Sequence, residues 1–504
     1  MKVNILIGGK AGQGPNILAD VIAGGLIDKG FYVFYSRDYQ SLIRGGHNFN
    51  VLSFSDSQIY SNSSEMDILI CLDENTEKLH KKELKKNSIV LSGEEQHNMY
   101  FAGIIYKIFG MDLRSLERHL RDLRNFDENM REARKGYNNE TRKIELPVNT
   151  LKKLNFMSGN QAISASAIKS GLEYYYSYPM TPATPVMMEL GTLQTKKENK
   201  HKVIELENEI AVLNAALGSS LVGARAMVGT SGGGFDLMTE ALSLSGMAEI
   251  PVVIYLASRP GPSTGLATYT GQGDFNVSLY SGHGEFNRVV IAPGDPVECE
   301  EAVNQAFYLS QKFRIPAIVL GDKHLAESKY VLEAEPHLVQ IINSITQLER
   351  FNSYESDKSQ FNTATEKPEV IKKNVERRAK IGKDIQKEAG RFEMFKVYGN
   401  KNSKNIIVSW GSPKGAILDA LNENKIDAKF IQIIYLEPFS EKIKSELEKA
   451  SRIILVENNA SGKLSELITQ KTGIFVEDKN KILRYDGRPF LSDELAEEIS
   501  RRLR

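Results

Sequence analysis

The sequence predicts an α/β protein of three domains with mainly parallel sheets. Its 504 residues exceed one domain, because a domain usually holds roughly 100 to 200 residues. Short apolar runs alternate with helical segments over most of the chain, which is typical of βαβ units. A charged stretch before residue 150 and a strand-free stretch after residue 330 interrupt this rhythm. We therefore expect α/β domains at 1–150, 151–330 and 404–504, with a charged connecting segment at 331–403.

The first domain is expected to begin with a strand and a helix at 16–29. Its strands should form a parallel sheet in the βαβ rhythm. They are predicted at 3–7, 31–35, 50–54, 67–72 and 88–91. From 111 to 150 the chain is charged and rich in asparagine, which indicates a helical pair followed by a linker.

The second and third α/β units repeat the pattern. In the second unit, which begins at 159–162, strands are predicted at 203–206, 226–229, 252–257, 288–291 and 317–320. In the third unit they are predicted at 405–409, 429–434, 452–457 and 485–490. Between these units, the basic stretch 371–380 indicates a helix that is either a solvated connection or a docking surface for an acidic partner.

The composition excludes several classes of protein. Basic and acidic residues both number 64, so the formal net charge is zero and the chain lacks the positive field of a nucleic-acid-binding protein. No apolar run approaches the ~20 residues that a membrane helix needs. The N-terminus becomes glycine-rich after five mostly apolar residues, too few for a signal peptide. We expect a cytoplasmic protein that binds neither nucleic acid nor a membrane.

A glycine-rich segment, 8–15, follows the first strand and opens the first helix. Gly12 and Gly14 let backbone N–H groups approach a phosphate, and the helix N-terminus adds partial positive charge. The segment also fits a tight structural turn, since its spacing matches neither a dinucleotide-binding nor a Walker motif. Arg44, which precedes two glycines, suits either a second anion contact or a structural turn.

Two further features follow strands of the second unit. In 178–185, three prolines stiffen the backbone and Thr181 lies between two of them, so its hydroxyl could contact a ligand. Glu209 lies in the first turn of a predicted helix, where a glutamate either stabilises the helix dipole or, if buried, tunes the protonation of a ligand nitrogen. A structural role remains open for both.

A third strand of the same unit leads into Arg259 and a loop rich in glycine, proline, serine and threonine. Arg259 could clamp a carboxylate with two hydrogen bonds, with Thr264 and Thr268 as neutral partners. A structural ion pair is the alternative. Only two cysteines occur, Cys71 and Cys299, which excludes a disulfide framework and any four-cysteine metal or cluster site made by this chain alone.

Taken in order, these motifs resemble the 2-oxoacid:ferredoxin oxidoreductases, in the form whose γ domain is fused ahead of the α subunit. The resemblance covers most of the chain, and its most specific part pairs Tyr-Pro-x-Thr-Pro with Gly-Pro-Ser-Thr-Gly. It rests on the segments 8–14, 44–46, 159–160, 178–182, 209, 224–226, 230–232, 261–265, 411–415, 437–439, 457–464 and 486–490. It implies a γ-like domain, a domain that binds the pyrimidine of thiamine diphosphate, and a transketolase C-terminal-like domain.

The resemblance also implies half of an enzyme, with metal ligands absent from this chain. A β subunit would hold the diphosphate, Mg²⁺ and a [4Fe–4S] cluster, because this chain lacks a Gly-Asp-Gly…Asn motif and enough cysteines. The complex would oxidatively decarboxylate a 2-oxoacid such as pyruvate or 2-oxoglutarate, pass electrons to ferredoxin, and transfer the acyl group to coenzyme A. Two alternatives remain: half of a dehydrogenase that passes acyl groups to lipoamide, and a cofactor-free assembly subunit.

Residue roles follow from the same resemblance. Glu209 would hydrogen-bond N1′ of the aminopyrimidine and promote the imino form, in a site that Tyr178 and Pro179 help to build. Arg259 would bind the substrate carboxylate beside Thr181 and Thr264, and Thr268 would contact the 2-oxoacid side chain. Three γ-like residues would receive coenzyme A phosphates: Gly12, Gly14 and Arg44.

Overall fold

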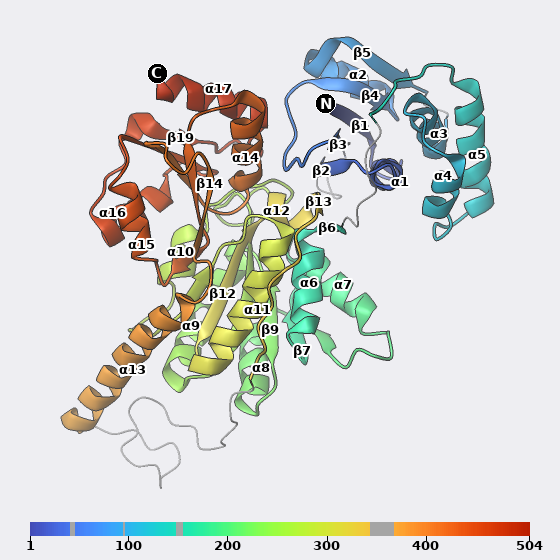
Figure 1. The fold of residues 1–504 in the computed structure, drawn as a ribbon. Coiled ribbons are helices and arrows are strands. Elements are labelled where there is room, and N and C mark those ends of the chain that lie inside the picture. Colours follow the sequence, from blue (N-terminus) through green and yellow to red (C-terminus); the bar gives the residue numbers. More distant parts are fainter. Residues whose placement is uncertain (41–45, 94–95, 148–154, 343–366) are drawn as a thin grey trace.

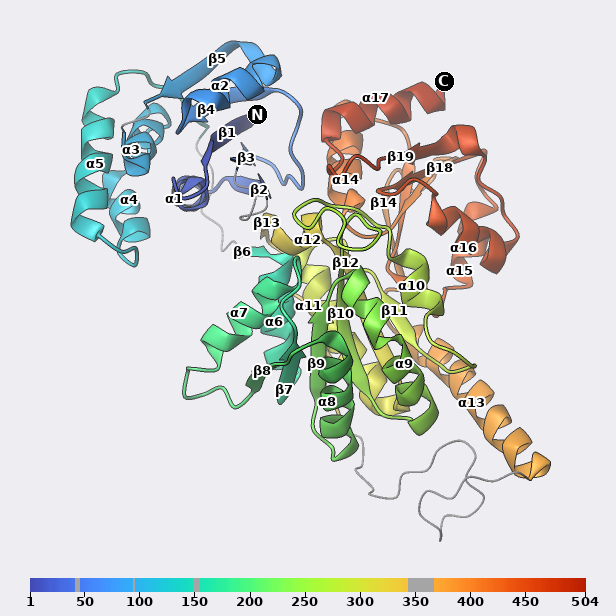
Figure 2. The same cartoon turned by 180° about the vertical axis from the view of Figure 1, so that it is seen from behind.

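The computed structural model describes residues 1–40, 46–93, 96–147, 155–342 and 367–504. Three lobes, each built on one sheet, meet near the short strand β13 (Lys329–Leu332) and the helix α12 (Lys323–Glu327) (Figure 1). The opposite view shows the same three lobes (Figure 2). The α/β fold with mainly parallel sheets is therefore confirmed. No helix among the described residues is long and apolar enough to cross a membrane.

The first lobe contains a mixed sheet in the order β5-β4-β1-β3-β2-β13-β6. Its early elements are β1 (Lys2–Lys10), α1 (Pro15–Asp28), β2 (Tyr32–Asp38), β3 (His47–Ser55), β4 (Met66–Cys71), α2 (Glu74–His80), η1 (Lys81–Glu83), β5 (Leu84–Ser92), α3 (Asn98–Ile108), α4 (Leu113–Leu120) and α5 (Phe126–Asn139). The five strands and the helical pair confirm the sequence prediction.

The expectation of a parallel sheet in this lobe is wrong, because the observed sheet is mixed. Strands β4 and β5 run parallel to their neighbours, but β3 is antiparallel to both β1 and β2. Only the segment 39–46 joins β2 to β3. A parallel crossover needs a dozen or more residues, so this short connection forces the chain to return antiparallel.

Two strands from later in the chain complete the first sheet. β6 (Asn155–Ser158) and β13 lie at its edge, with β13 antiparallel to both β2 and β6. The sequence did not predict either strand, because each has only four residues. The first sheet consequently ties the residues before 150 to the second lobe by backbone hydrogen bonds.

The second lobe is a parallel sheet in the order β17-β11-β12-β10-β9-β7-β8, with β17 (Tyr435–Glu437) antiparallel at one edge. Its other elements are α6 (Gly159–Lys169), β7 (Tyr174–Ser177), α7 (Thr184–Leu193), β8 (Lys202–Glu205), α8 (Glu209–Leu221), β9 (Ala226–Thr230), α9 (Gly232–Ala248), β10 (Val252–Ser258), α10 (Phe275–Tyr280), β11 (Val289–Ile291), α11 (Pro296–Phe313) and β12 (Pro316–Asp322). Its central strands β9, β10 and β12 are buried along their whole length, as expected for a parallel sheet covered by helices on both faces.

The third lobe contains the sheet β14-β16-β15-β18-β19. The helix α13 (Pro368–Ala389) precedes this lobe and packs against the second lobe. The elements of the third lobe are β14 (Phe395–Gly399), β15 (Asn405–Ser409), α14 (Pro413–Asn424), β16 (Lys429–Ile433), α15 (Lys442–Leu447), β18 (Arg452–Glu457), α16 (Lys463–Thr472), η2 (Asp478–Asn480), β19 (Lys481–Leu483) and α17 (Ser492–Leu503). Helix α13 includes the basic stretch expected to be helical, and Arg377 within it pairs with Glu249 of the second lobe. Two details differ from the prediction: β14 falls inside the expected connecting segment, and 485–490 is a loop that follows β19.

Candidate active site

The carboxyl edge of the second sheet gathers three of the residues singled out from the sequence. Thr181 follows β7, Glu209 follows β8 and Arg259 directly follows β10. Because β7, β8, β9 and β10 run parallel, their carboxyl ends meet at one edge. The prediction that Thr181 and Arg259 share a sheet edge is confirmed, and Glu209 lies at the same edge.

Glu209 is the first residue of α8, but it does not cap that helix. The side chain of the preceding Asn208 accepts the backbone N–H of Ala211 (2.9 Å) and satisfies the helix start. Glu209 is only 3% exposed, and its Oε1 is buried without a hydrogen-bond partner among the described residues. Since a buried polar atom without a partner is costly, this oxygen is suited to a ligand that brings a donor.

The first turn of α9 makes room for this carboxylate. A Cβ atom at Gly234 would overlap Glu209 Oε1 and the hydroxyl oxygen of Thr230, the last residue of β9. Any residue other than glycine would therefore displace the carboxylate. This requirement explains the glycine at position 234, a residue type that otherwise weakens a helix.

Arg259 and Thr181 contact each other across the end of β9. The guanidinium Nη1 of Arg259 donates to the backbone carbonyl of Thr181 (2.7 Å), so the threonine contributes its backbone oxygen and not only a hydroxyl. Burial lowers the pKa of Arg259, but an arginine stays charged near neutral pH. Among the described residues, no other hydrogen bond of the guanidinium is seen, so its remaining donors can bind an anionic ligand.

A buried amide fixes the proline-rich loop that carries Thr181. Asn160 in α6 donates through Nδ2 to the carbonyl of Pro182 (3.0 Å) and accepts from the hydroxyl of Tyr255 in β10 (3.0 Å). The loop is thus held from two elements. Tyr178 and Pro179, at the start of this loop, are exposed.

No hydrogen bond among the described residues joins the two other threonines to Thr181 or Arg259. Thr264 is exposed, whereas Thr268 is buried and lines a cavity of about 280 Å³ where the three lobes meet. This cavity also takes Lys323 from α12 and Arg488 from the third lobe. Arg488 lies 4.3 Å from the ring centre of Tyr269 and 3.3 Å from Asp38 Oδ2. The cavity therefore offers cationic groups beside Thr268.

The glycine-rich loop of the first lobe is a tight turn held by Gln13. Gln13 accepts the backbone N–H of Lys10 (2.7 Å) and donates to the carbonyl of Leu72 (2.7 Å). Gly12 and Gly14 have φ of 94° and 75°, which favours glycine at both positions, and Gly14 directly precedes α1. Arg44 lies outside the described residues.

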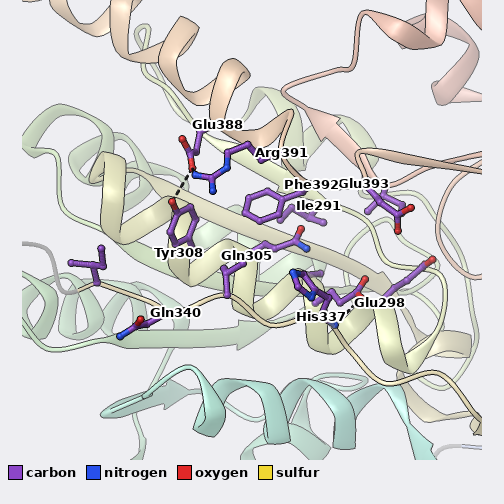
Figure 3. A pocket seen from close by; sticks show the side chains of 15 residues that line it. Ile291, Glu298, Gln305, Tyr308, His337, Gln340, Glu388, Arg391, Phe392 and Glu393 are labelled. Atoms are coloured by element: carbon purple, nitrogen blue, oxygen red, sulfur yellow. Dashed lines mark hydrogen bonds and ion pairs between the residues drawn. The ribbon is translucent and has the colours of Figure 1, made fainter.

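A further cavity, of about 580 Å³, is remote from all these residues. It lies between α11 and the end of α13 and contains the pair of Tyr308 and Glu388 (Figure 3). Its lining includes several carboxylates and no residue that the sequence singled out as part of a site.

The two cysteines are also remote from the sheet edge: Cys71 ends β4 and Cys299 lies in α11, and burial raises the pKa of both thiols.

One residue beside the edge was not anticipated from the sequence. Asp274 precedes α10, and its carboxyl group lies against Gly232 at the start of α9. Its only sequence signal is its place in Gly271-Gln272-Gly273-Asp274, a loop fifteen residues beyond Arg259. Because of this separation in sequence, the pattern does not reveal that Asp274 lies near Arg259 in the fold.

Comparisons with known proteins agree with the observed folds of the first two lobes. Residues 165–391 match the thiamine diphosphate-binding family of pyruvate flavodoxin/ferredoxin oxidoreductases, and residues 4–97 match the pyruvate ferredoxin/flavodoxin oxidoreductase family. The first of these ranges includes Thr181, Glu209 and Arg259.

Two curated relatives have similar sequences. The chain is 30% identical over 624 residues to a 2-oxoacid:ferredoxin oxidoreductase subunit alpha from Saccharolobus solfataricus, covering 99% of this chain and 97% of the relative. It is 31% identical over 337 residues to the 2-oxoglutarate synthase subunit KorA from Methanocaldococcus jannaschii, covering 61% of this chain and 89% of that protein.

A solved structure shares the whole fold. The 2-oxoglutarate:ferredoxin oxidoreductase from Magnetococcus marinus, determined with 2-oxoglutarate, coenzyme A and succinyl-CoA bound, superposes with a TM-score of 0.87. The match covers 100% of both chains at 21% sequence identity. At that identity the likeness concerns the arrangement of all three lobes.

Proposed function

This chain belongs to the 2-oxoacid:ferredoxin oxidoreductases, and from that premise we propose that it is the α subunit of such an enzyme, with a γ-like domain fused at its N-terminus. The complex would oxidatively decarboxylate a 2-oxoacid, transfer the acyl group to coenzyme A and pass electrons to ferredoxin. The observation that carries the site assignment is the buried carboxylate oxygen of Glu209 at the sheet edge, which has no hydrogen-bond partner within the described part of the chain.

The residues at this edge fit the aminopyrimidine part of thiamine diphosphate. Glu209 offers an acceptor that has no partner among the described residues, and Gly234 leaves space beside it. When bound, thiamine diphosphate supplies the nucleophilic carbon and the electron sink for decarboxylation. Glu209 would hold a proton between its carboxylate and a ring nitrogen, which is the kind of proton transfer that a buried carboxyl group performs well.

Arg259 is proposed to bind the carboxylate of the 2-oxoacid. Its contact with the Thr181 carbonyl fixes the guanidinium, so that the donors not used there can form parallel hydrogen bonds to the substrate. A carboxylate held in this way keeps the neighbouring carbonyl carbon in one orientation. Thr181 thus acts through Arg259 as well as through its own hydroxyl.

A partner chain is part of the proposal. Helices α8 and α9, which cover one face of the sheet, expose large apolar side chains, which is typical of an interaction surface: Ile210 at 51%, Leu237 at 49% and Leu244 at 42%. We infer that a β subunit covers this face and brings the diphosphate site, Mg²⁺ and a [4Fe–4S] cluster. The two cysteines of this chain cannot form such a cluster by themselves.

Coenzyme A is proposed to enter where the three lobes meet. The cavity beside Thr268 brings Lys323 and Arg488 close to the first lobe, and cations of this kind suit the phosphates of coenzyme A. The glycine-rich loop with Gly12 and Gly14 belongs to the same lobe, and the family resemblance adds Arg44, which lies outside the described residues. Thr268 would then lie between this entrance and the 2-oxoacid.

The proposal is tested by purifying the chain alone and together with the untagged partner it captures. The lone chain should be colourless and inactive, whereas the complex should reduce ferredoxin with a 2-oxoacid and coenzyme A. An iron–sulfur absorption band in the lone chain would contradict the assignment of the cluster to the partner subunit. Acyl transfer to lipoamide without ferredoxin reduction would identify a dehydrogenase component, and a complex without thiamine diphosphate would identify an assembly subunit.

A further inference from the structure

Asp274 occupies a constrained place beside Arg259. Its backbone N–H donates to the hydroxyl of Ser258 (3.4 Å), the residue at the end of β10 that directly precedes Arg259. Its side chain makes no capping hydrogen bond to α10, the helix that it precedes. An aspartate at a helix start usually accepts such a bond, so this carboxyl group is directed elsewhere.

The carboxyl group instead lies against the first turn of α9. A Cβ atom at Gly232 would overlap both carboxyl oxygens of Asp274, so the approach depends on a glycine there. Asp274 Oδ2 is buried and has no hydrogen-bond partner among the described residues, and the same holds for the hydroxyl of the neighbouring Ser231. Two polar groups without partners therefore lie together at the start of this helix.

The first turn of α9 thus separates two carboxyl groups, the buried one of Glu209 and that of Asp274, of which Oδ2 is buried. Glu209 contacts it at Gly234 and Asp274 contacts it at Gly232, each with one oxygen that lacks a partner within the described ranges. The charged groups that face Asp274 are Arg259 after β10 and Asp236 on α9. Burial raises the pKa of Asp274 to about 6, with a further increase from Asp236, although Ser258 and Arg259 act in the opposite direction.

We propose that Asp274 is a second acid of the active site, a positioning residue that couples binding of the 2-oxoacid carboxylate at Arg259 to the uptake of one proton. This inference rests on the proposed function. A substrate carboxylate brought to Arg259 adds a second negative charge beside a buried carboxyl group, and like charges at one site cannot all remain ionised at low cost. Asp274 therefore becomes neutral when the substrate binds, and its hydroxyl hydrogen can then be donated.

The sign of the pH dependence follows from linkage. The substrate carboxyl group is ionised throughout the range near neutral pH, so its own titration does not contribute. Below a pH of about 6, Asp274 is already protonated in the free enzyme and binding requires no proton. As the pH rises above this value, the free enzyme loses the proton that the complex must regain. Substrate binding should therefore weaken with increasing pH.

The experiment uses the complex of this chain with its partner and compares Asp274→Asn with the unmodified protein between pH 5.5 and 8. In the unmodified complex, KM for the 2-oxoacid should rise at least about threefold between pH 5.5 and 7. In Asp274→Asn, which keeps the shape but cannot ionise, KM should stay at its low-pH value. The matched control is Asp236→Asn, which removes an exposed carboxylate nearby and should preserve the rise.

Two additional measurements separate a proton-linked role from a structural one. Calorimetry with oxamate, an unreactive analogue, in buffers of different ionisation enthalpy should show uptake of about half to one proton at pH 7, and none in Asp274→Asn. Gly232→Ala, which displaces the carboxyl group without removing it, should also flatten the KM profile. Arg259→Lys should raise KM at every pH instead.

The outcomes distinguish the two proposals. If the complex oxidises 2-oxoacids but Asp274→Asn keeps the full rise in KM and the proton uptake, the assignment of Asp274 is wrong while the proposed function stands. If no 2-oxoacid supports reduction of ferredoxin at any pH in the unmodified complex, the proposed function fails. Oxamate calorimetry still reports on Asp274 in that case, because it requires no turnover.

Discussion

Glu209 presents a carboxylate oxygen to the interior of the second lobe while Asn208 performs the capping of α8. Glu209→Gln keeps the volume of the side chain but removes a carboxylate that can take up a proton. We expect kcat of the complex to fall on the order of 10²-fold, within the usual range of general acid–base catalysis. Deuterium exchange at C2 of bound thiamine diphosphate measures the step directly.

The control for this variant is Glu207→Gln, which changes an exposed glutamate two residues earlier. It should exchange and turn over as the unmodified complex does. Unchanged exchange in an intact Glu209→Gln complex would return Glu209 to a purely structural role.

The sequence could indicate residues of the candidate site only where they directly follow strands. Thr181, Glu209 and Arg259 each come shortly after a predicted strand, and parallel strands bring their carboxyl ends together. Asp274 could not be predicted, because it does not follow a strand. The loop after β10 leaves the sheet edge and returns to it only at Asp274, fifteen residues after Arg259. The same loop carries Thr268 into a different cavity, so neighbours in sequence became separated in space.

At the scale of elements, α3 and α5 of the first lobe approach so closely that each presents a glycine to the other. A Cβ atom at Gly136 in α5 would overlap the carbonyl of Tyr100 in α3, and one at Gly103 would overlap the carbonyl of Ala133. Gly136→Ala should force the helices apart and cost ~1 to 3 kcal/mol, the usual penalty for overpacking. A lower Tm in a thermal melt of the purified chain would measure this loss.

A glycine in an open position supplies the matched control. Gly191 lies in α7, and a Cβ atom there would meet no atom within 4 Å among the described residues. Gly191→Ala should leave the Tm unchanged or raise it, because alanine favours a helix by ~0.5 to 1 kcal/mol. Equal losses in both variants would contradict the role of close helix packing.

The longer elements could be predicted from the sequence, whereas their pairing could not. Apolar runs located the strands that became β1 to β4, since each buries most of its residues, and the short apolar run at 88–91 located β5. The directions of these strands depend on the lengths of their connections. The apolar pattern does not reveal that the connection between β2 and β3 is too short for a parallel crossover. The segment 485–490 was misassigned because its Asp486-Gly487 turn, in which Asp486 accepts the N–H of Arg488 (2.9 Å), interrupts the apolar pattern.

At the scale of the whole molecule, a buried ionic cluster joins the second and third lobes. Lys414 in α14 pairs with Asp295 and with Glu298 of α11 (2.7 Å), and its side chain is 4% exposed. Burial would raise the pKa of Glu298, but the charges of Lys414 and Lys396 outweigh this and lower it to about 2. The cluster therefore stabilises the folded chain above the unfolded pKa of a glutamate and loses this contribution as the pH falls towards 2.

Lys414→Met should be strongly destabilising because it leaves two buried carboxylates with less compensation. Removing one partner of a buried pair costs ~3 to 5 kcal/mol. The Tm near neutral pH should therefore fall by ~3 °C or more, and the difference from the unmodified chain should shrink in acid. Lys444→Met, which removes an exposed pairing 4.0 Å from Glu448, should have almost no effect. Equal Tm values for the two variants would mean that the buried cluster does not stabilise the contact between the second and third lobes.

The strand β13 has a consequence for how a gene can encode this protein. It lies between β2 and β6, so backbone hydrogen bonds already connect the first lobe to the second without help from the peptide chain. Gene fission between these lobes would remove only the high effective concentration that a covalent tether provides. The shared sheet would still specify how the two products reassemble, because β13 would pair with β2 as it does in the single chain. The same architecture can therefore be built from one polypeptide or from two.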